Sequence, residues 1–302
     1  MAINTSQIAQ LLRPGLDAVF GDMPTYPEQW TEIFKTHKSE MSYEIDVEMK
    51  FLGAADIKAE GANYSSDTMS QKIVNIFRHS TVGLMFEITK EALEDNLYKT
   101  QFPQQAASLK NALKVAKNIL GASILNNAFN TSFLLGDGQP LCSNAHPIEG
   151  GVYSNSLAGN ANVDFSEAGV EAAIIAIQKF PMQSGILAQV MPKKLIVPRE
   201  LQFAASRLLN SQFRTDTANN DINALYHGDY IPQGYRVNQY LTSPSSWFIL
   251  TDADNGMKHF QRTPVATDVY VNFMNDNLQC KASERYSFGC ANPRAIFGSP
   301  GV

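Results

Sequence analysis

The stretch LLGDGQPLCSNAHPIEGG, residues 134–151, follows a long helical pattern and places Asp137, Cys142 and His146 within ten residues. Glycine supplies the backbone angles of tight turns, and a histidine followed by a proline is typical of a turn. We therefore interpret the stretch as a structural loop, in which His146 hydrogen-bonds the backbone. The residues expected to form this loop are Gly136, Asp137, Gly138, His146 and Pro147.

The same residues could instead carry chemistry. Cys142 with His146 as its base would make a thiol nucleophile, but catalytic cysteine and histidine are usually far apart in sequence and converge in space. They could also be two of the four ligands of a zinc ion, but Cys280 and Cys290 are ten residues apart, which matches no compact zinc motif. No cysteine lies in a CxxC, so all three are expected to be reduced thiols. We predict no catalytic residue, no metal site and no cofactor.

Composition and charge exclude several classes of protein. The 302 residues are 44% hydrophobic and 18% charged, which is typical of a globular protein rather than a disordered one. The net charge of −5 provides no basic surface of the kind that holds duplex DNA through many phosphate contacts. The N-terminus lacks the pattern of a signal peptide, and no apolar run is long enough to span a membrane, so we expect a cytosolic product with no membrane partner.

A strand pattern begins at Tyr43, after an arm of residues 1–42 that contains a short amphipathic helix over residues 5–20. Apolar and charged residues alternate from there, which predicts a strand with one buried face and one solvated face. The apolar residues are Ile45, Val47, Met49 and Phe51, and the charged residues are Glu44, Asp46, Glu48 and Lys50.

This strand opens a long hairpin over residues 43–88, whose tip is the Gly- and Ser-rich segment 53–67. A two-stranded ribbon is marginally stable in water and exposes its edges, so we expect it to lie on another copy of the chain. The residues expected to contact that copy are Ile45, Val47, Met49, Phe51, Ile73 and Phe77.

The strongest helical pattern covers residues 103–130. Pro103 lies in its first turn, and apolar residues, mostly leucines, recur at intervals of three and four residues. Gly121 within it predicts close packing or a bend. The lysines at 110, 114 and 117 share the opposite side and are expected to be solvated. Strand and helix patterns alternate over residues 166–210, which indicates a compact α/β unit, and strands return after it.

Two segments of the chain resemble phage major head proteins of the Mu type. DGQPLCSNAHPIEGGVYSN, residues 137–155, is similar to the loop of the form D-G-x-x-L-x-S-x-x-H-P with a following Gly pair that comes straight after the long helix in that family. ERYSFGCANPRAIFGS, residues 284–299, resembles the closing strand of the family. It keeps Arg294, Phe297 and Gly298 but lacks the tryptophan of the family's aromatic-Asp-Trp-Arg string.

The order of the expected elements is similar to that of the Hong Kong 97 type capsid fold over nearly the whole chain. The resemblance implies an α+β fold divided into four parts. These are an N-terminal arm at 1–42, an extended β-hairpin loop at 43–88, a peripheral domain at 89–163 and 263–302 with its spine helix at 103–130, and an axial domain at 164–262.

The resemblance also implies a function, which is that of a major capsid protein without enzymatic activity. Such a protein self-assembles as hexamers and pentamers into an icosahedral shell that encloses phage DNA, and it is assembled in the bacterial host cytoplasm and becomes part of the virion. Its implied partners are other copies of itself, portal, scaffold and decoration proteins, and packaged double-stranded DNA contacted weakly and without sequence specificity.

Two rival functions remain open from the sequence alone. An encapsulin-type compartment shell would keep the same architecture, and a cytosolic cysteine hydrolase would use Cys142 and His146. Some members of the capsid family cross-link lysine to asparagine between subunits. We expect no such cross-link from Lys50, Lys58 or Lys72, because no catalytic carboxylate can be assigned to them.

Overall fold

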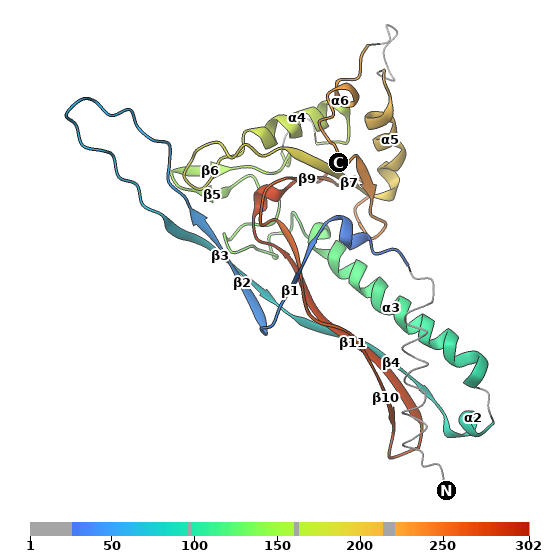
Figure 1. The fold of residues 1–302 in the computed structure, drawn as a ribbon. Helices are drawn as coiled ribbons and strands as arrows, with labels where there is room; N and C mark the ends of the chain where they lie inside the picture. Colours follow the sequence, from blue (N-terminus) through green and yellow to red (C-terminus); the bar gives the residue numbers. More distant parts are fainter. Residues whose placement is uncertain (1–25, 96–97, 160–162, 214–220, 302) are drawn as a thin grey trace.

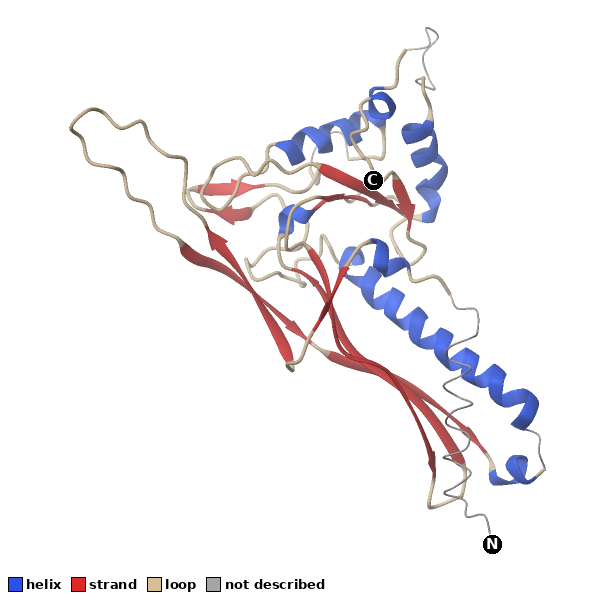
Figure 2. Cartoon of the chain, viewed as in Figure 1, coloured by secondary structure: helices blue, strands red, loops and turns tan. Residues whose placement is uncertain are grey.

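The computed structural model describes residues 26–95, 98–159, 163–213 and 221–301. The helix expected over residues 5–20 lies outside them. The described chain forms two four-stranded sheets, a long helix and a hairpin that projects to one side of the body (Figure 1). In Figure 2 the long helix follows the first sheet, and several of the shorter helices gather around the second. No helix in the described part is long and apolar enough to cross a membrane.

The first sheet is built around two long strands. β10 (Met257–Val271) pairs antiparallel with β11 (Leu278–Cys290), β1 (Lys35–Lys38) joins β10 in parallel, and β4 (Ser80–Ile88) joins the other side of β11 antiparallel. Alternate residues of β11 are buried, because the long helix α3 covers that face. These residues are Leu278, Cys280, Ala282, Glu284 and Tyr286.

The long helix α3 spans Tyr98–Asn126, so the range predicted from its pattern, 103–130, is wrong at both ends. Pro103 does not start the helix. A proline in the second turn loses the bond only to a carbonyl of the first turn, so the helix can begin before it. At the other end the chain turns because the carbonyl of Ala128 accepts the N–H of Cys142 at 2.8 Å.

The sheet-facing side of α3 buries both apolar and charged groups. Leu109 and Leu113 pack against Ala282 of β11. Lys117, expected to be solvated, is buried and pairs with Glu284 of β11 at 2.9 Å. The close packing expected at Gly121 is confirmed, because a Cβ there would lie 2.9 Å from the Cβ of Trp30 in η1 (Gln29–Glu32).

The projecting hairpin consists of β2 (Tyr43–Lys50) and β3 (Ser70–Arg78), paired antiparallel. The predicted hairpin of residues 43–88 is therefore too long. Its last ten residues leave β2, because the backbone of β4 pairs with β11 and Ile88 packs against Leu278. The chain continues from β4 into the short helix α2 (Lys90–Glu94).

The second sheet has the order β12-β9-β7-β8 and carries the largest cluster of buried apolar residues in the described chain. Its strands are β7 (Pro192–Val197), β8 (Tyr235–Val237), β9 (Trp247–Thr251) and β12 (Ile296–Ser299). The helical segments connected to it are α4 (Glu167–Gln178), η2 (Arg199–Leu201), α5 (Gln202–Asn210), α6 (Ala224–His227) and η3 (Pro293–Ala295). Ser166 caps α4 as expected, since its side chain accepts the N–H of Gly169.

The boundaries of the peripheral and axial domains stay a prediction, and the strand pairing adds one observation to it. β12 belongs to the segment 263–302 that was assigned to the peripheral domain, yet it pairs with β9 of the segment assigned to the axial domain. Since strand pairing joins the two segments through backbone hydrogen bonds, the last residues of the chain connect the two parts of the body.

Candidate assembly surface

The hairpin turns its charged residues toward the body of its own chain, which corrects the sequence expectation that this face is solvated. Glu44 accepts a hydrogen bond from the Ser39 hydroxyl. Asp46 pairs with Lys258 of β10, and Glu48 pairs with Arg294 of η3. The physical reason is that the body presents cationic and polar groups, rather than an apolar surface, beneath most of β2.

The opposite face of the hairpin is apolar and points away from the body. Ile45 lies across from Ile76, and Val47 lies across from Val74, so the four side chains form one stripe. Tyr43 continues it toward the root. We name these five residues the outer stripe. Tyr43, Ile45, Val74 and Ile76 are 48%, 53%, 44% and 55% exposed, and Val47 is half-buried.

The six residues predicted to contact another copy do not share one environment. Ile45 and Phe51 are exposed, and Val47 and Met49 are half-buried. Ile73 and Phe77 are buried in their own chain, which leaves them little surface for another subunit. The ring of Phe77 lies 5.0 Å from that of Phe260, which places it in the root of the hairpin. Sequence reasoning missed Tyr43, Val74 and Ile76, although each sits at an alternate position of the two strands.

The tip of the hairpin is held at its base by Asp67. This carboxylate accepts the N–H of Gly53 at 2.8 Å and pairs with Lys50, and the Gly53 contact is the main reason that its pKa is lowered to about 2. Lys50 and Lys72 also pair with Glu149, and Lys58 lies over the ring of Tyr64 at 4.4 Å. The three lysines considered for cross-linking thus all have partners inside the chain.

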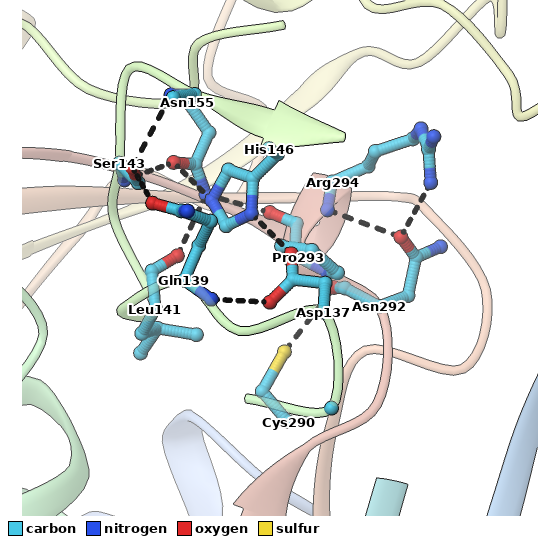
Figure 3. A network of polar contacts seen from close by, with 12 residues as sticks. Asp137, Gln139, Leu141, Ser143, His146, Asn155, Cys290, Asn292, Pro293 and Arg294 are labelled. Atoms are coloured by element: carbon cyan, nitrogen blue, oxygen red, sulfur yellow. Dashed lines mark hydrogen bonds and ion pairs between the residues drawn. The ribbon is translucent and has the colours of Figure 1, made fainter. Parts of the chain in front are cut away.

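The loop 134–151 is joined to the end of the chain by a buried polar network (Figure 3), and it is joined to the hairpin by the N–H of Gly136, which donates to the side-chain oxygen of Asn75. His146, at the start of β5 (His146–Ile148), lies 2.6 Å from Asp137 through Nδ1 and 3.0 Å from the Asn155 side-chain oxygen through Nε2. Asn155, just past β6 (Gly151–Tyr153), donates to three backbone carbonyls, those of Leu141, Pro293 and Ile296.

The sequence expectation for this loop differs from the structure in one respect. His146 hydrogen-bonds two side chains rather than the backbone, and Asn155 makes the backbone contacts. Gly138 has a φ of 76°, which favours glycine. Gly136 approaches the hairpin so closely that a Cβ there would lie 2.1 Å from the carbonyl oxygen of Val74. One feature of the sequence could have pointed to a role for Asn155, because it is the last residue of the segment 137–155 that resembles the capsid family.

A family model described as phage capsid protein matches residues 75–298. The chain belongs to this family. The match begins within the second strand of the hairpin and covers the loop network and both sheets except β1 and the last residue of β12, so the resemblance to phage capsid proteins is confirmed. No curated protein matches the chain in sequence.

Solved structures of similar fold include viral shells from distant sources. The virus-like particle from Pyrococcus furiosus matches with a TM-score of 0.54 at 11% identity, over 96% of this chain and 98% of that one. The capsid of cyanophage P-SCSP1u matches with 0.55 at 9% identity, over 92% and 89%. The procapsid of bacteriophage JBD30 matches with 0.53 at 12% identity, over 98% and 76%. The α+β capsid fold of the Hong Kong 97 type is confirmed.

The cysteines of this capsid protein are buried thiols. Burial raises the pKa of Cys142 well above its usual range, and it raises those of Cys280 and Cys290 to about 11 and 12. Both ring nitrogens of His146 are occupied by Asp137 and Asn155, so neither is available to take a proton from Cys142. Among the residues that the structure describes, no group of three or more His, Cys, Asp or Glu side chains could hold a metal ion.

A second exposed apolar site lies at the far end of the capsid protein's first sheet. Phe273 and Met274, in the turn between β10 and β11, are 95% and 90% exposed. The turn is tied to α2 by an ion pair between Asp276 and Lys90 at 3.1 Å. Sequence reasoning missed this site, although two large apolar residues between asparagines in a turn are an unusual signal.

Proposed function

We propose that this capsid protein is the major shell subunit and that the outer stripe of its hairpin binds a neighbouring copy. The observation that carries the proposal is the orientation of the hairpin, whose charged face is paired within the chain while its apolar face is not covered by any of the described residues. A contiguous exposed apolar surface on a marginally stable ribbon is typical of a protein interface. A second copy of the chain is the partner that a shell supplies at every position.

The contact is heterologous, because the stripe of one subunit meets a different surface of the next. Heterologous contacts generate closed rings when the rotation closes, which is the geometry that hexamers and pentamers of an icosahedral shell require. Phe273 and Met274, at the opposite end of the molecule, offer a second contact of the same kind. The two sites would bind different neighbours, since they lie on opposite sides of the body (Figure 1).

The shell would enclose phage DNA within the virion and would be assembled in the bacterial host cytoplasm, with portal, scaffold and decoration proteins as its further partners. The net charge of −5 supports weak contact with the DNA without sequence specificity. The role is structural. A buried Cys142 with a raised pKa is a poor nucleophile, which argues against the cysteine hydrolase.

A compartment shell of the encapsulin type is the second candidate. The fold does not separate the two, because a shell of either kind would keep the same architecture. The match to the phage capsid family favours a viral shell. The genes beside this one would separate them, since a phage locus carries portal and terminase genes and a compartment locus carries a cargo enzyme.

Electron microscopy and sedimentation of the purified protein test the proposal. The wild-type chain should form shells, rings or tubes, and Ile45→Asp should remain a soluble monomer, because a carboxylate in the outer stripe would be buried unpaired at the contact. Ile175→Asp on α4 is the matched control, since Ile175 is 52% exposed, and this variant should assemble. Normal assembly of Ile45→Asp would contradict the proposed contact, and a wild-type chain that stays monomeric at high concentration would contradict the shell function.

A further inference from the structure

The inner face of the hairpin is attached to the body mainly by polar and charged groups. Four alternate residues of β2 meet four different segments: Glu44 meets Ser39, Asp46 meets Lys258, Glu48 meets Arg294, and Lys50 meets Glu149. Apolar packing is concentrated at the root, where Phe77 joins Phe260 and Ala291 in one cluster. Further out, β2 is held by charge, and β3 also buries Ile73 and Asn75.

The cations on the body side are buried, and Arg294 is held in position independently of the hairpin. Arg294 is 4% exposed, its Nε donates to the carbonyl of Pro181 at 2.5 Å, and its guanidinium carbon lies 4.7 Å from the centre of the Tyr153 ring. Lys258 is buried in β10. Because a buried cation without a counter-charge is costly, both cations favour the hairpin orientation that brings a carboxylate to each of them.

Between the ion pairs the interface is not closely packed. A cavity of about 460 Å³ lies between β2 and the body, and its lining includes Asp46, Glu48, Gln183 and Arg294. Glu48 Oε2, Gln183 Nε2 and Arg294 Nη2 are buried there, and none has a hydrogen-bond partner among the described residues. A gap of this size leaves room for β2 to move, while β3 packs closely against Gly136 and is hydrogen-bonded through Asn75, so the ion pairs decide how β2 is inclined to the body.

We propose that the Asp46–Lys258 and Glu48–Arg294 ion pairs are positioning contacts that set the inclination of the hairpin to its own body and thereby the curvature of the assembled shell. This inference rests on the proposed function of the outer stripe. The outer stripe binds the neighbouring subunit, and the inner face of the hairpin binds the body of its own chain. The inclination of the hairpin to its own body therefore sets the angle between adjacent subunits. A strand of eight residues spans roughly 27 Å, and a tilt of about 10° would move its far end by roughly 5 Å.

Particle diameter and hydrogen exchange test the inference. The variant Asp46→Asn/Glu48→Gln keeps the shape of both side chains and removes both charges. Its particles should differ from wild type in mean diameter or show a broader range of diameters in electron micrographs. The amides of β2 and β3 in the unassembled chain should exchange at least about tenfold faster. Glu200→Gln, which removes the exposed ion pair with Arg199 outside the hairpin and outside the β10–β11 turn, should match the wild type in both measurements.

The charge-swapped variant Asp46→Lys/Lys258→Asp separates positioning from a general loss of stability. It restores one ion pair with reversed polarity, and its particles should have the wild-type diameter, while Asp46→Lys alone should not. Wild-type diameters and exchange rates in Asp46→Asn/Glu48→Gln would overturn the inference, as would a loss of particles in Asp46→Lys that the swap does not restore. If the wild-type chain formed no particles, the proposed function would fail, and the exchange rates would still decide whether the ion pairs hold the hairpin.

Discussion

The hairpin β2–β3 and the strand pair β10–β11 are both long antiparallel ribbons, yet they bury opposite kinds of face. In β11 the alternate residues that face α3 are buried, and they include Leu278 and Ala282. In β2 the alternate residues that face the body are charged, and the apolar ones point to solvent. The difference is what covers each ribbon. A helix with its own leucines covers the first, and no part of the chain that the structure describes covers the apolar face of the second.

The largest expected effect is a loss of unfolding free energy. It distinguishes the buried Lys117–Glu284 ion pair under α3 from the exposed Lys90–Asp276 ion pair at the far end of the same sheet. Glu284→Gln leaves the buried Lys117 without its counter-charge and should cost about 3–5 kcal/mol of unfolding free energy. Asp276→Asn removes an exposed pair and should cost at most about 1 kcal/mol. Urea denaturation of the unassembled chain measures both. Equal costs would show that α3 does not shield the first pair from water.

A smaller effect compares the two ribbons directly. Leu113→Ala removes a side chain packed between α3 and β11 and should destabilise the unassembled chain by about 2–5 kcal/mol. Ile45→Ala removes an exposed side chain of the outer stripe and should change stability by no more than about 0.5 kcal/mol. The same denaturation experiment applies. A large loss in Ile45→Ala would mean that the stripe is covered within the single chain.

The third effect is a pH dependence of the unfolding free energy, and it belongs to the covered ribbon β10–β11. Burial, followed by the charge of Lys117, lowers the pKa of His259 in β10 to about 3, and the unfolded histidine titrates near 6.5. Between these two pH values the unfolded state therefore binds more protons than the folded state. The contribution of His259 to the free energy of unfolding is thus fully present above pH 6.5 and is lost as the pH falls toward 3.

Replacing His259 by glutamine should remove this acid sensitivity and flatten the slope of unfolding free energy against pH by up to about 1.4 kcal/mol per pH unit. Burial also lowers the pKa of His79, at the root of the hairpin, which gives a slope of the same sign. Denaturation midpoints measured from pH 7 to pH 4 for the wild type and His259→Gln make the comparison. An unchanged slope in the variant would refute the assignment to His259.

Local patterns predicted the elements better than their ends and their surroundings. The alternation from Tyr43 predicts the strand β2, and the repeat of leucines predicts α3, because both patterns reflect geometry within a few residues. The end of the hairpin at Arg78 was missed because β4 has the same alternation as β3. Pairing with β11, about 200 residues later, separates them. Lys117 was misplaced for a related reason, since its partner Glu284 is distant in the sequence.

The loop 134–151 shows the same division within one site. The pair of Asp137 and His146 could be singled out from the sequence, because both lie in one short turn-rich segment. Asn155 could not be assigned its role in this way. It binds the carbonyls of Pro293 and Ile296, which only folding brings to the loop. The exposed Phe273 and Met274 were missed because an apolar residue in a turn is accessible or buried depending on the rest of the molecule.

The amino-acid sequence by itself determined that this protein has an amphipathic strand beginning at Tyr43, a long helix whose predicted range of 103–130 overlaps α3, and a tight polar loop after it, and through the quoted segments it indicated a capsid protein. The tertiary structure alone decided which face of the strand is buried. Alternation separates two faces but does not orient them. Orientation follows from the free energy of what lies opposite, and here buried Lys258 and Arg294 draw in the acidic face and leave the apolar face outside.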